Sequence, residues 1–302
     1  MSFDFISISR RIRTLGTEIS PEAIQGTAAL YAPFHEHEPY RDDVRITRDV
    51  SYGENERQRL DIFEPAGAAA PQAGRKAPVL MFVHGGGFVG GDKHMPGSPY
   101  NDNVALWAVR HGLVGINITY RLAPQFRWPS GAEDVAAAVA WARAHIGTRG
   151  GDPERIFLLG TSAGAVHAAS YVAHAQFHGA SGSGVAGAIL LSGMYDLTTA
   201  PRSPMQTAYF GEDDAQYRRA STLSGLVESP VPLLFVITEM DPLDFQKQAL
   251  GVLTAWTARH GRWPRLVHMV GHNHLSSTMH LNTPDTFLGE TILDLIDDSS
   301  AG

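Results

Sequence analysis

The segment Gly-Thr-Ser-Ala-Gly at residues 160–164 carries the residues of this chain best suited to covalent chemistry. It follows an apolar run at residues 155–159 and precedes an alanine-rich run. A strand, a sharp turn and a helix are therefore predicted, with the serine hydroxyl lifted clear of the sheet. Glycines two residues to either side remove the side chains that would collide at such a turn. We expect Ser162 to be a nucleophile.

Three consecutive glycines at residues 85–87 follow another apolar run. Because they lack Cβ atoms, their backbone N–H groups can approach a ligand closely. The negative oxygen of an acyl-transfer intermediate needs donors of this kind. We predict an oxyanion hole formed by the N–H groups of Gly86, Gly87 and Ala163. His84 is expected to hold the glycine loop by hydrogen bonds rather than to transfer protons.

A serine hydroxyl also needs a general base within hydrogen-bond reach. The chain has 14 histidines, so position must narrow the choice. His272 and His274 follow the last apolar run, residues 266–270, at the sheet edge where open α/β sheets bind ligands. We favour His274, which lies a few residues past the predicted strand, and His272 is the alternative.

The acid that orients the histidine is expected after the preceding strand, at residues 233–237. Asp241 is the best candidate, because its carboxylate would accept the imidazole N–H and fix the tautomer. Glu239 is a weaker alternative, and Asp244 could cap the next helix. The order along the chain is then oxyanion loop, serine, acid and histidine.

These segments must be positioned by an alternation of strands and helices, which predicts a mainly parallel sheet covered on both faces. The fold class is α/β. The expected strands are residues 45–50, 58–63, 79–83, 114–120, 156–159, 187–191, 233–237 and 266–270. The expected helices are residues 101–111, 131–146, 163–177, 244–260 and 284–297.

Two regions fall outside this alternation. Residues 1–40 carry two helical patterns, at 3–15 and 21–32, and are expected to form a helical segment that contributes to a cap. Residues 41–302 would form the catalytic domain, in which the polar residues 201–227 look like a cap-like insertion. Residues 65–77 are rich in Ala, Gly and Pro and are expected to be an exposed loop.

Composition excludes several classes of protein. The net charge is −7 with no strongly basic block, which argues against a nucleic-acid partner. There is no cysteine, so the chain has no disulfide framework, thiol nucleophile or thiolate zinc site. No stretch approaches the roughly 18 apolar residues of a membrane span, and the start does not read as a signal peptide. We expect a soluble cytoplasmic protein.

The motifs together resemble those of the hormone-sensitive-lipase-like esterases. They are His-Gly-Gly-Gly-Phe at 84–88, Tyr-Arg-Leu-Ala-Pro at 120–124, the serine motif at 160–164 and Asp-Pro-Leu at 241–243, with Trp128-Pro129 and Glu133-Asp134 at the usual spacing. Residues 59–63 and 90–93 are more similar to the neighbouring feruloyl-esterase-like and arylformamidase branch. The resemblance covers residues 45–297.

The resemblance implies an α/β-hydrolase fold with a central sheet of about eight strands, a small cap, no cofactor and no metal. It implies a small-molecule ester substrate of short to medium acyl chain, cleaved through an acyl-serine intermediate, with Ser162, Asp241 and His274 as the triad. A homodimer is also compatible with it. The candidate pocket residues, for each of which plain packing is an equal alternative, are Phe88, Trp128, Met194, Tyr209, Phe210 and Leu275.

Three other functions compete with ester hydrolysis. An arylformamidase or amidase would use the same triad. A ligand-binding protein on a hydrolase scaffold is disfavoured because all three triad residues are present. The segment His35-Glu36-His37 and the pair His272 and His274 suggest a metalloenzyme, but neither spacing gives a convincing ligand set.

Overall fold

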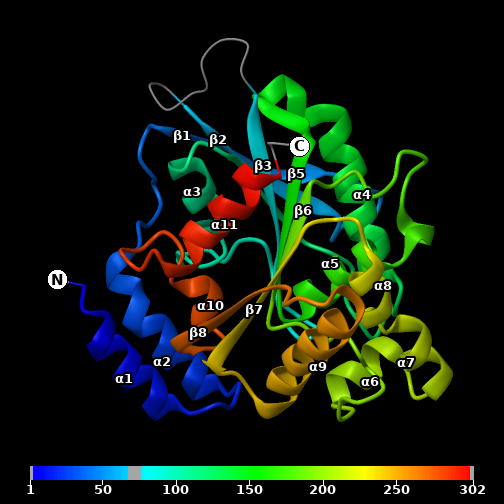
Figure 1. The fold of residues 1–302 in the computed structure, drawn as a ribbon. Helices are drawn as coiled ribbons and strands as arrows, with labels where there is room; N and C mark the ends of the chain where they lie inside the picture. The colour runs from blue at the N-terminus through cyan, green and yellow to red at the C-terminus, as the bar shows by residue number, and fades with distance from the viewer. Residues whose placement is uncertain (1–2, 67–75, 300–302) are drawn as a thin grey trace.

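Eight strands form one sheet in the order β1-β2-β4-β3-β5-β6-β7-β8 (Figure 1). The computed structural model describes residues 3–66 and 76–299, so most of the loop expected at 65–77 lies outside the described residues. β2 runs antiparallel to β1 and β4, and the pairs from β4 through β8 are parallel. The prediction of a mainly parallel α/β sheet of about eight strands is confirmed. The strands are β1 (Val44–Ser51), β2 (Arg59–Pro65), β3 (Ala77–Val83), β4 (Val114–Ile118), β5 (Gly151–Thr161), β6 (Gly187–Leu191), β7 (Leu233–Met240) and β8 (Arg265–Asn273).

Helices cover both faces of the sheet. The helices are α1 (Phe5–Leu15), α2 (Pro21–Tyr31), α3 (Asp102–Arg110), α4 (Ser130–His145), α5 (Ala163–Ala173), α6 (Pro204–Phe210), α7 (Asp214–Ala220), α8 (Leu223–Glu228), α9 (Leu243–His260), α10 (Ser276–Met279) and α11 (Phe287–Asp298). Short 3₁₀ turns are η1 (Ala32–Phe34), η3 (Ile146–Arg149) and η4 (Ala175–Phe177). α3 and α11 pack on one face, and α4, α5, α8 and α9 pack on the other. No helix in the described part of the chain is long and apolar enough to cross a bilayer.

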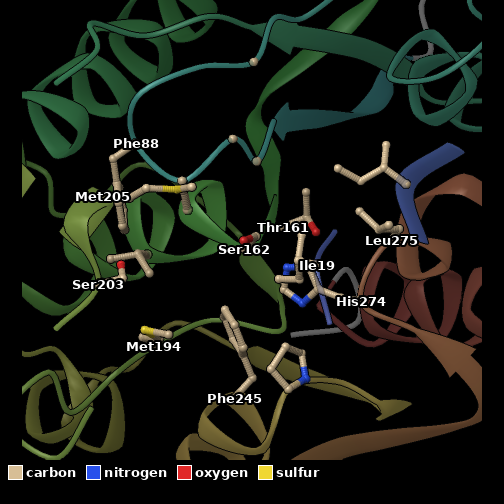
Figure 2. A pocket seen from close by; sticks show the side chains of 18 of the residues that line it. Ile19, Phe88, Thr161, Ser162, Met194, Ser203, Met205, Phe245, His274 and Leu275 are labelled. Atoms are coloured by element: carbon tan, nitrogen blue, oxygen red, sulfur yellow. The ribbon is translucent and has the colours of Figure 1, made fainter. Parts of the chain in front are cut away.

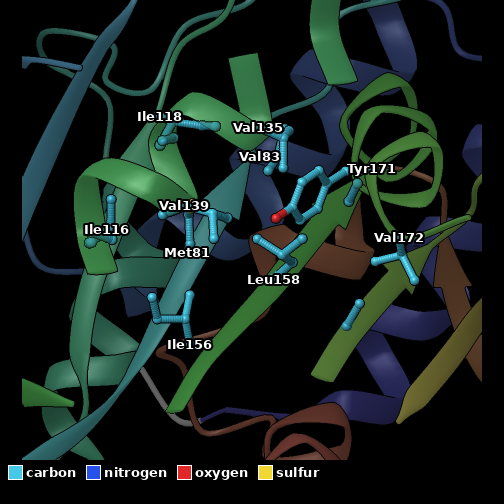
Figure 3. Close-up of a cluster of buried hydrophobic side chains, with 14 of the residues drawn as sticks. Met81, Val83, Ile116, Ile118, Val135, Val139, Ile156, Leu158, Tyr171 and Val172 are labelled. Atoms are coloured by element: carbon cyan, nitrogen blue, oxygen red, sulfur yellow. The ribbon is translucent and has the colours of Figure 1, made fainter. Parts of the chain in front are cut away.

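The central strands are apolar on both faces because each face is buried under helices. In β3, Met81 and Val83 point to the face of α4 and α5, whereas Leu80 and Phe82 point to the face of α3 and α11. Figure 3 shows the first of these two cores, where side chains of α4 and α5 lie against the strands. Complete burial of one such aliphatic side chain contributes about 1.5–3 kcal/mol, so the two layers together stabilise the central strands.

The N-terminal helices lie against the last strand and its loop, beside the C-terminal edge of the sheet (Figure 1). α1 begins at Asp4, whose carboxylate accepts the N–H groups of Ile6 and Ser7. α2 begins at Ser20, whose side chain accepts the N–H of Ala23. Such caps satisfy N–H groups that a helix start leaves free. α1 packs on β8 and α2 packs on α10.

Candidate active site

Ser162 stands on the turn between β5 and α5, with φ 54° and ψ −120°. A positive φ is rare for a residue with a side chain, and such strain persists only where surrounding structure enforces it. A Cβ at Gly164 would lie 2.0 Å from the Val83 carbonyl oxygen, and one at Gly160 would lie 2.5 Å from the Gly164 carbonyl oxygen. Both glycines are therefore required by close backbone packing, as the sharp turn predicts.

The glycine loop lies directly against Ser162. A Cβ at Gly85 would be 3.4 Å from the Ser162 Cβ. Gly86 and Gly87 have φ values of 130° and 59°, so the loop depends on glycine. Within the described residues, the N–H groups of Gly86, Gly87 and Ala163 donate to no other protein group. Three donors are thus available beside the serine hydroxyl.

His84 holds this loop in place. Its Nδ1 is 2.5 Å from the Gly85 carbonyl oxygen, and its ring stacks on Tyr120 at 4.4 Å. The Tyr120 hydroxyl donates to the His84 carbonyl oxygen at 2.8 Å. Burial lowers the pKa of His84 to about 4, so the ring is neutral at neutral pH and serves as a fixed support.

Asp241 follows β7 and accepts three hydrogen bonds. Its Oδ1 is 2.6 Å from His274 Nδ1, and its Oδ2 accepts the Ser192 hydroxyl and the Thr238 N–H, each at 2.7 Å. Burial alone would raise the pKa of Asp241, but the hydrogen bonds and the neighbouring His274 outweigh it and hold the pKa below the ordinary value. The carboxylate is therefore charged and fixes His274 with its Nδ1 protonated.

The other ring nitrogen of His274 is directed to the cavity. Nε2 is buried and has no hydrogen-bond partner in the part of the chain that the structure describes. His274 and Ser162 line the same cavity and lie next to each other in Figure 2. No hydrogen bond joins Ser162 to His274 Nε2 among the described residues, and catalytic hydrogen bonds are often long or poorly aligned until substrate binds. The arrangement suits proton transfer between Ser162 and His274.

The alternative candidates for the base and the acid, His272, Glu239 and Asp244, have different surroundings. His272 Nδ1 is 3.2 Å from the Ser276 hydroxyl, and burial lowers the His272 pKa to about 2. Glu239 binds Arg13 rather than a histidine. Asp244 lies in the first turn of α9, makes no capping hydrogen bond and lines the cavity. None of the three is in hydrogen-bond contact with His274 or Ser162.

A largely apolar cavity of about 740 Å³ opens at the serine. Three of the six residues expected to line the pocket do so: Phe88, Met194 and Leu275. Trp128, Tyr209 and Phe210 do not line it, which corrects that expectation. Tyr209 stacks on the far side of Phe88 at 4.7 Å, Phe210 meets Phe88 edge to face, and Trp128 packs in the same cluster. They support the pocket wall from behind.

The sequence analysis did not predict the other residues that line the cavity, because they come from separate segments and share no motif. Ile19 and Ile24 come from the N-terminal segment, Met205 comes from α6, and Phe245 comes from α9. Ile19, Ile24 and Met205 are unusually exposed for apolar residues, at 43%, 40% and 52%. Exposed apolar side chains that gather at one cavity are the signal for a binding site, but it appears only after folding.

Metal-ligating side chains gather elsewhere. Among the described residues, Glu38, His94 and Asp102 bring their ligand atoms within 4.8 Å of one another. Arg48 already bridges this group, donating to Glu38 at 2.6 Å and to Asp102 at 2.5 Å. His35 contacts the Met279 carbonyl oxygen at 2.7 Å. The cluster is an ion-pair network that joins Glu38 of the N-terminal segment, through Arg48 of β1, to Asp102 of α3.

Comparison with known proteins places the chain in a family. Residues 80–268 match the family described as alpha/beta hydrolase fold, and the chain belongs to this family. Esterase LipQ of Mycobacterium tuberculosis is 32% identical over 229 residues, which are 73% of this chain and 52% of LipQ. Esterase LipC of the same organism is 34% identical over 169 residues, 52% of this chain and 40% of LipC. The chain thus spans about half the length of the curated relatives that it matches.

Solved structures share the fold over nearly the whole chain. Esterase B from Lactobacillus rhamnosis has a TM-score of 0.72 at 19% identity, covering 99% of this chain and 97% of that one. An esterase from the bacterial hormone-sensitive lipase family has a TM-score of 0.67 at 22% identity, covering 99% and 98%. At these identities the likeness establishes the fold, and the expected α/β-hydrolase resemblance is confirmed.

Proposed function

We propose that this protein is a serine hydrolase that cleaves carboxylic esters through an acyl-serine intermediate. The observation that carries the proposal is the 2.6 Å contact between Asp241 and His274, which leaves His274 Nε2 facing the cavity that Ser162 lines. Relatives named as esterases, LipQ and LipC, support the same reaction class.

The reaction follows from the positions of these groups. His274 Nε2 takes the proton of Ser162 Oγ as that oxygen attacks the ester carbonyl carbon. The carbonyl oxygen becomes negative and accepts hydrogen bonds from the N–H groups of Gly86, Gly87 and Ala163. His274 then protonates the departing alcohol, and water repeats the sequence on the acyl-serine to release the acid.

The position of His274 also determines the orientation of an ester substrate in the cavity. Because His274 must protonate the leaving oxygen, the alcohol group lies on the side of His274, with Ile19 and Leu275 (Figure 2). The acyl group then lies on the other side of Ser162, where Figure 2 shows Phe88, Met194 and Met205. Both sides are apolar, so uncharged acyl and alcohol groups fit best.

The first test compares the wild type with Ser162→Ala on a short p-nitrophenyl ester. We expect kcat to fall by roughly 10⁴- to 10⁶-fold, because covalent catalysis is lost while the cavity remains. A phosphonate probe should add its mass to the wild type and not to the variant. Near-normal turnover by Ser162→Ala would overturn the proposal.

The same assay separates esters from amides. The matching N-formyl or N-acyl arylamine is hydrolysed with kcat/KM far below that of the ester if the protein is an esterase. A comparable or higher rate on the amide would assign it to the arylformamidase or amidase branch with the same catalytic residues.

The oligomeric state, the cellular location and the absence of nucleic-acid binding are also proposals. We propose a homodimer and a cytoplasmic location, the latter supported by the absence of cysteine. Sedimentation at several concentrations tests the first, and fractionation of the native host tests the second. Retention on a nucleic-acid column would contradict the expectation, drawn from the net charge of −7, that no nucleic acid is bound.

A further inference from the structure

Strand β8 contains a bulge next to the candidate acid and base. Thr238 of β7 pairs with Met269 of β8, but Met240 pairs with Asn273. β8 therefore advances four residues where β7 advances two. Gly271 lies in the extra stretch with φ 85°. Bulges occur beside active sites, where they redirect a side chain.

The bulge determines which histidine meets Asp241. If the ladder continued without interruption from Thr238 and Met269, Asp241 would come level with His272. The two extra residues bring His274 to this place instead, with its Nδ1 2.6 Å from Asp241. The spacing of His272 and His274 matches the length of the insertion, so a lost bulge would exchange one histidine for the other.

Glu239 binds the bulge from the neighbouring strand. Its Oε2 accepts the N–H of Gly271 at 2.6 Å. A charged acceptor makes this hydrogen bond stronger than a neutral one. Glu239 lies two residues before Asp241, and Gly271 lies three residues before His274. One side chain thus joins the two segments that carry the acid and the base.

Arg13 of α1 holds the Glu239 carboxylate in turn. Arg13 Nε and one terminal nitrogen donate to the two Glu239 oxygens at 3.1 and 2.8 Å, and the other terminal nitrogen donates to Ser9 Oγ at 2.8 Å. A Cβ at Gly271 would lie 2.4 Å from Ser9 Oγ, so α1 packs directly on the bulge. The Arg13 and Glu239 side chains are 42% and 30% exposed. Exposed ion pairs add little to global stability, so the pair matters mainly through the geometry that it fixes.

We propose that Glu239, held by Arg13, is a positioning residue that maintains the bulge of β8 and so sets His274, rather than His272, against Asp241. The proposal rests on the proposed function, since His274 matters as the base of ester hydrolysis. Glu239 itself touches neither the serine nor the cavity among the described residues.

The test uses Glu239→Ala and Arg13→Met, with Glu239→Gln as the conservative variant and Arg259→Met as the matched control. Arg259 also binds a glutamate with two nitrogens, Glu228 at 2.6 and 3.1 Å, but it joins α9 to α8. We expect Glu239→Ala to lower kcat by about 10- to 100-fold with KM nearly unchanged, as for a misplaced catalytic group. Glu239→Gln, which keeps an acceptor for Gly271, should recover most of the loss. Arg259→Met should keep full activity.

One further readout distinguishes positioning from general loss of stability. The NMR signal of the proton between His274 Nδ1 and Asp241 should weaken in Glu239→Ala, whereas a purely structural role would leave it unchanged in the folded variant. An unchanged kcat in Glu239→Ala, or an equal loss in Arg259→Met, would overturn the proposal.

The NMR signal also keeps this proposal separate from the function. If the wild type hydrolysed no ester, the proposed function would fail, but the signal would still report the contact between His274 and Asp241. Its loss in Glu239→Ala supports the positioning role, and its retention overturns it.

Discussion

Burial and hydrogen bonds act in opposite directions on the charge of the Asp241 carboxylate. It is fully buried, yet its three donors, on His274, Ser192 and Thr238, keep it charged. The donors also fix its direction, so only one oxygen faces His274. A charged, immobile partner is what a histidine base needs, because it selects the tautomer and stabilises the imidazolium.

We therefore expect Asp241→Asn to lower kcat by about 10⁴-fold, as when a triad acid is replaced by an amide that favours the wrong tautomer. Volume is preserved, so the melting temperature should change much less than kcat. Steady-state kinetics and thermal unfolding measured on the same preparation test both parts. The assignment would be wrong if Asp241→Asn were harmless and Glu239→Gln were not.

At the scale of elements, α6 lies against the glycine loop. The helix begins with a capping box between Ser203 and Gln206, which orients its first turn. Met205 of this turn reaches the loop, and its sulfur would lie 2.2 Å from a Cβ at Gly87. α6 thus forms part of the cavity wall on the side assigned to the acyl group.

Met205→Ala should accordingly favour longer acyl chains. We expect the ratio of kcat/KM for a longer ester over a shorter one to rise by about tenfold, the usual effect of a few methylene contacts in an apolar pocket. The measurement is a series of p-nitrophenyl esters. Ile19→Ala is the matched control on the His274 side; it should change the preference among alcohols and leave the acyl series unaltered. The reverse pattern would show that the acyl group lies on the His274 side and the alcohol group on the Met205 side.

For the whole molecule, buried histidines link stability to pH. Burial lowers the pKa of His35 and His84 to about 4, that of His167 to about 3 and that of His272 to about 2. In the unfolded chain these rings bind protons near their ordinary pKa of 6.5. Below that pH the unfolded state holds more protons than the folded state, so acid destabilises the fold.

We expect the free energy of unfolding to be highest above pH 6.5 and to fall steadily between pH 6.5 and 4. His35→Gln should reduce the slope by up to about 1.4 kcal/mol per pH unit, because one titrating ring is gone. The amide can still donate to the Met279 carbonyl oxygen, as His35 does. Urea unfolding at several pH values measures the slope. Equal slopes in wild type and variant would show that His35 is already protonated in the folded state.

Several features followed from the sequence because they depend on local rules. The strand, turn and helix around Ser162, and the glycines that permit its φ of 54°, are encoded within a few residues. The parallel sheet follows from the alternation of strands and helices. The two segments at 59–63 and 90–93 were recognised as motifs, although only the structure shows that they meet, through an ion pair of Lys93 with Asp61 at 3.1 Å.

The sequence left His272 and His274 as alternatives and could not separate pocket residues from supporting ones. Both questions depend on contacts between distant segments. The pairing of β7 with β8, and the α1 side chains against Gly271, bring His274 to Asp241. Tyr209 stacks behind Phe88 and does not line the cavity, whereas Ile24 of α2 and Met205 of α6 do. The sequence by itself determined the candidate catalytic residues and the sheet that carries them. Only the tertiary structure decided register and cavity walls, because both are set by packing between segments that no local pattern connects.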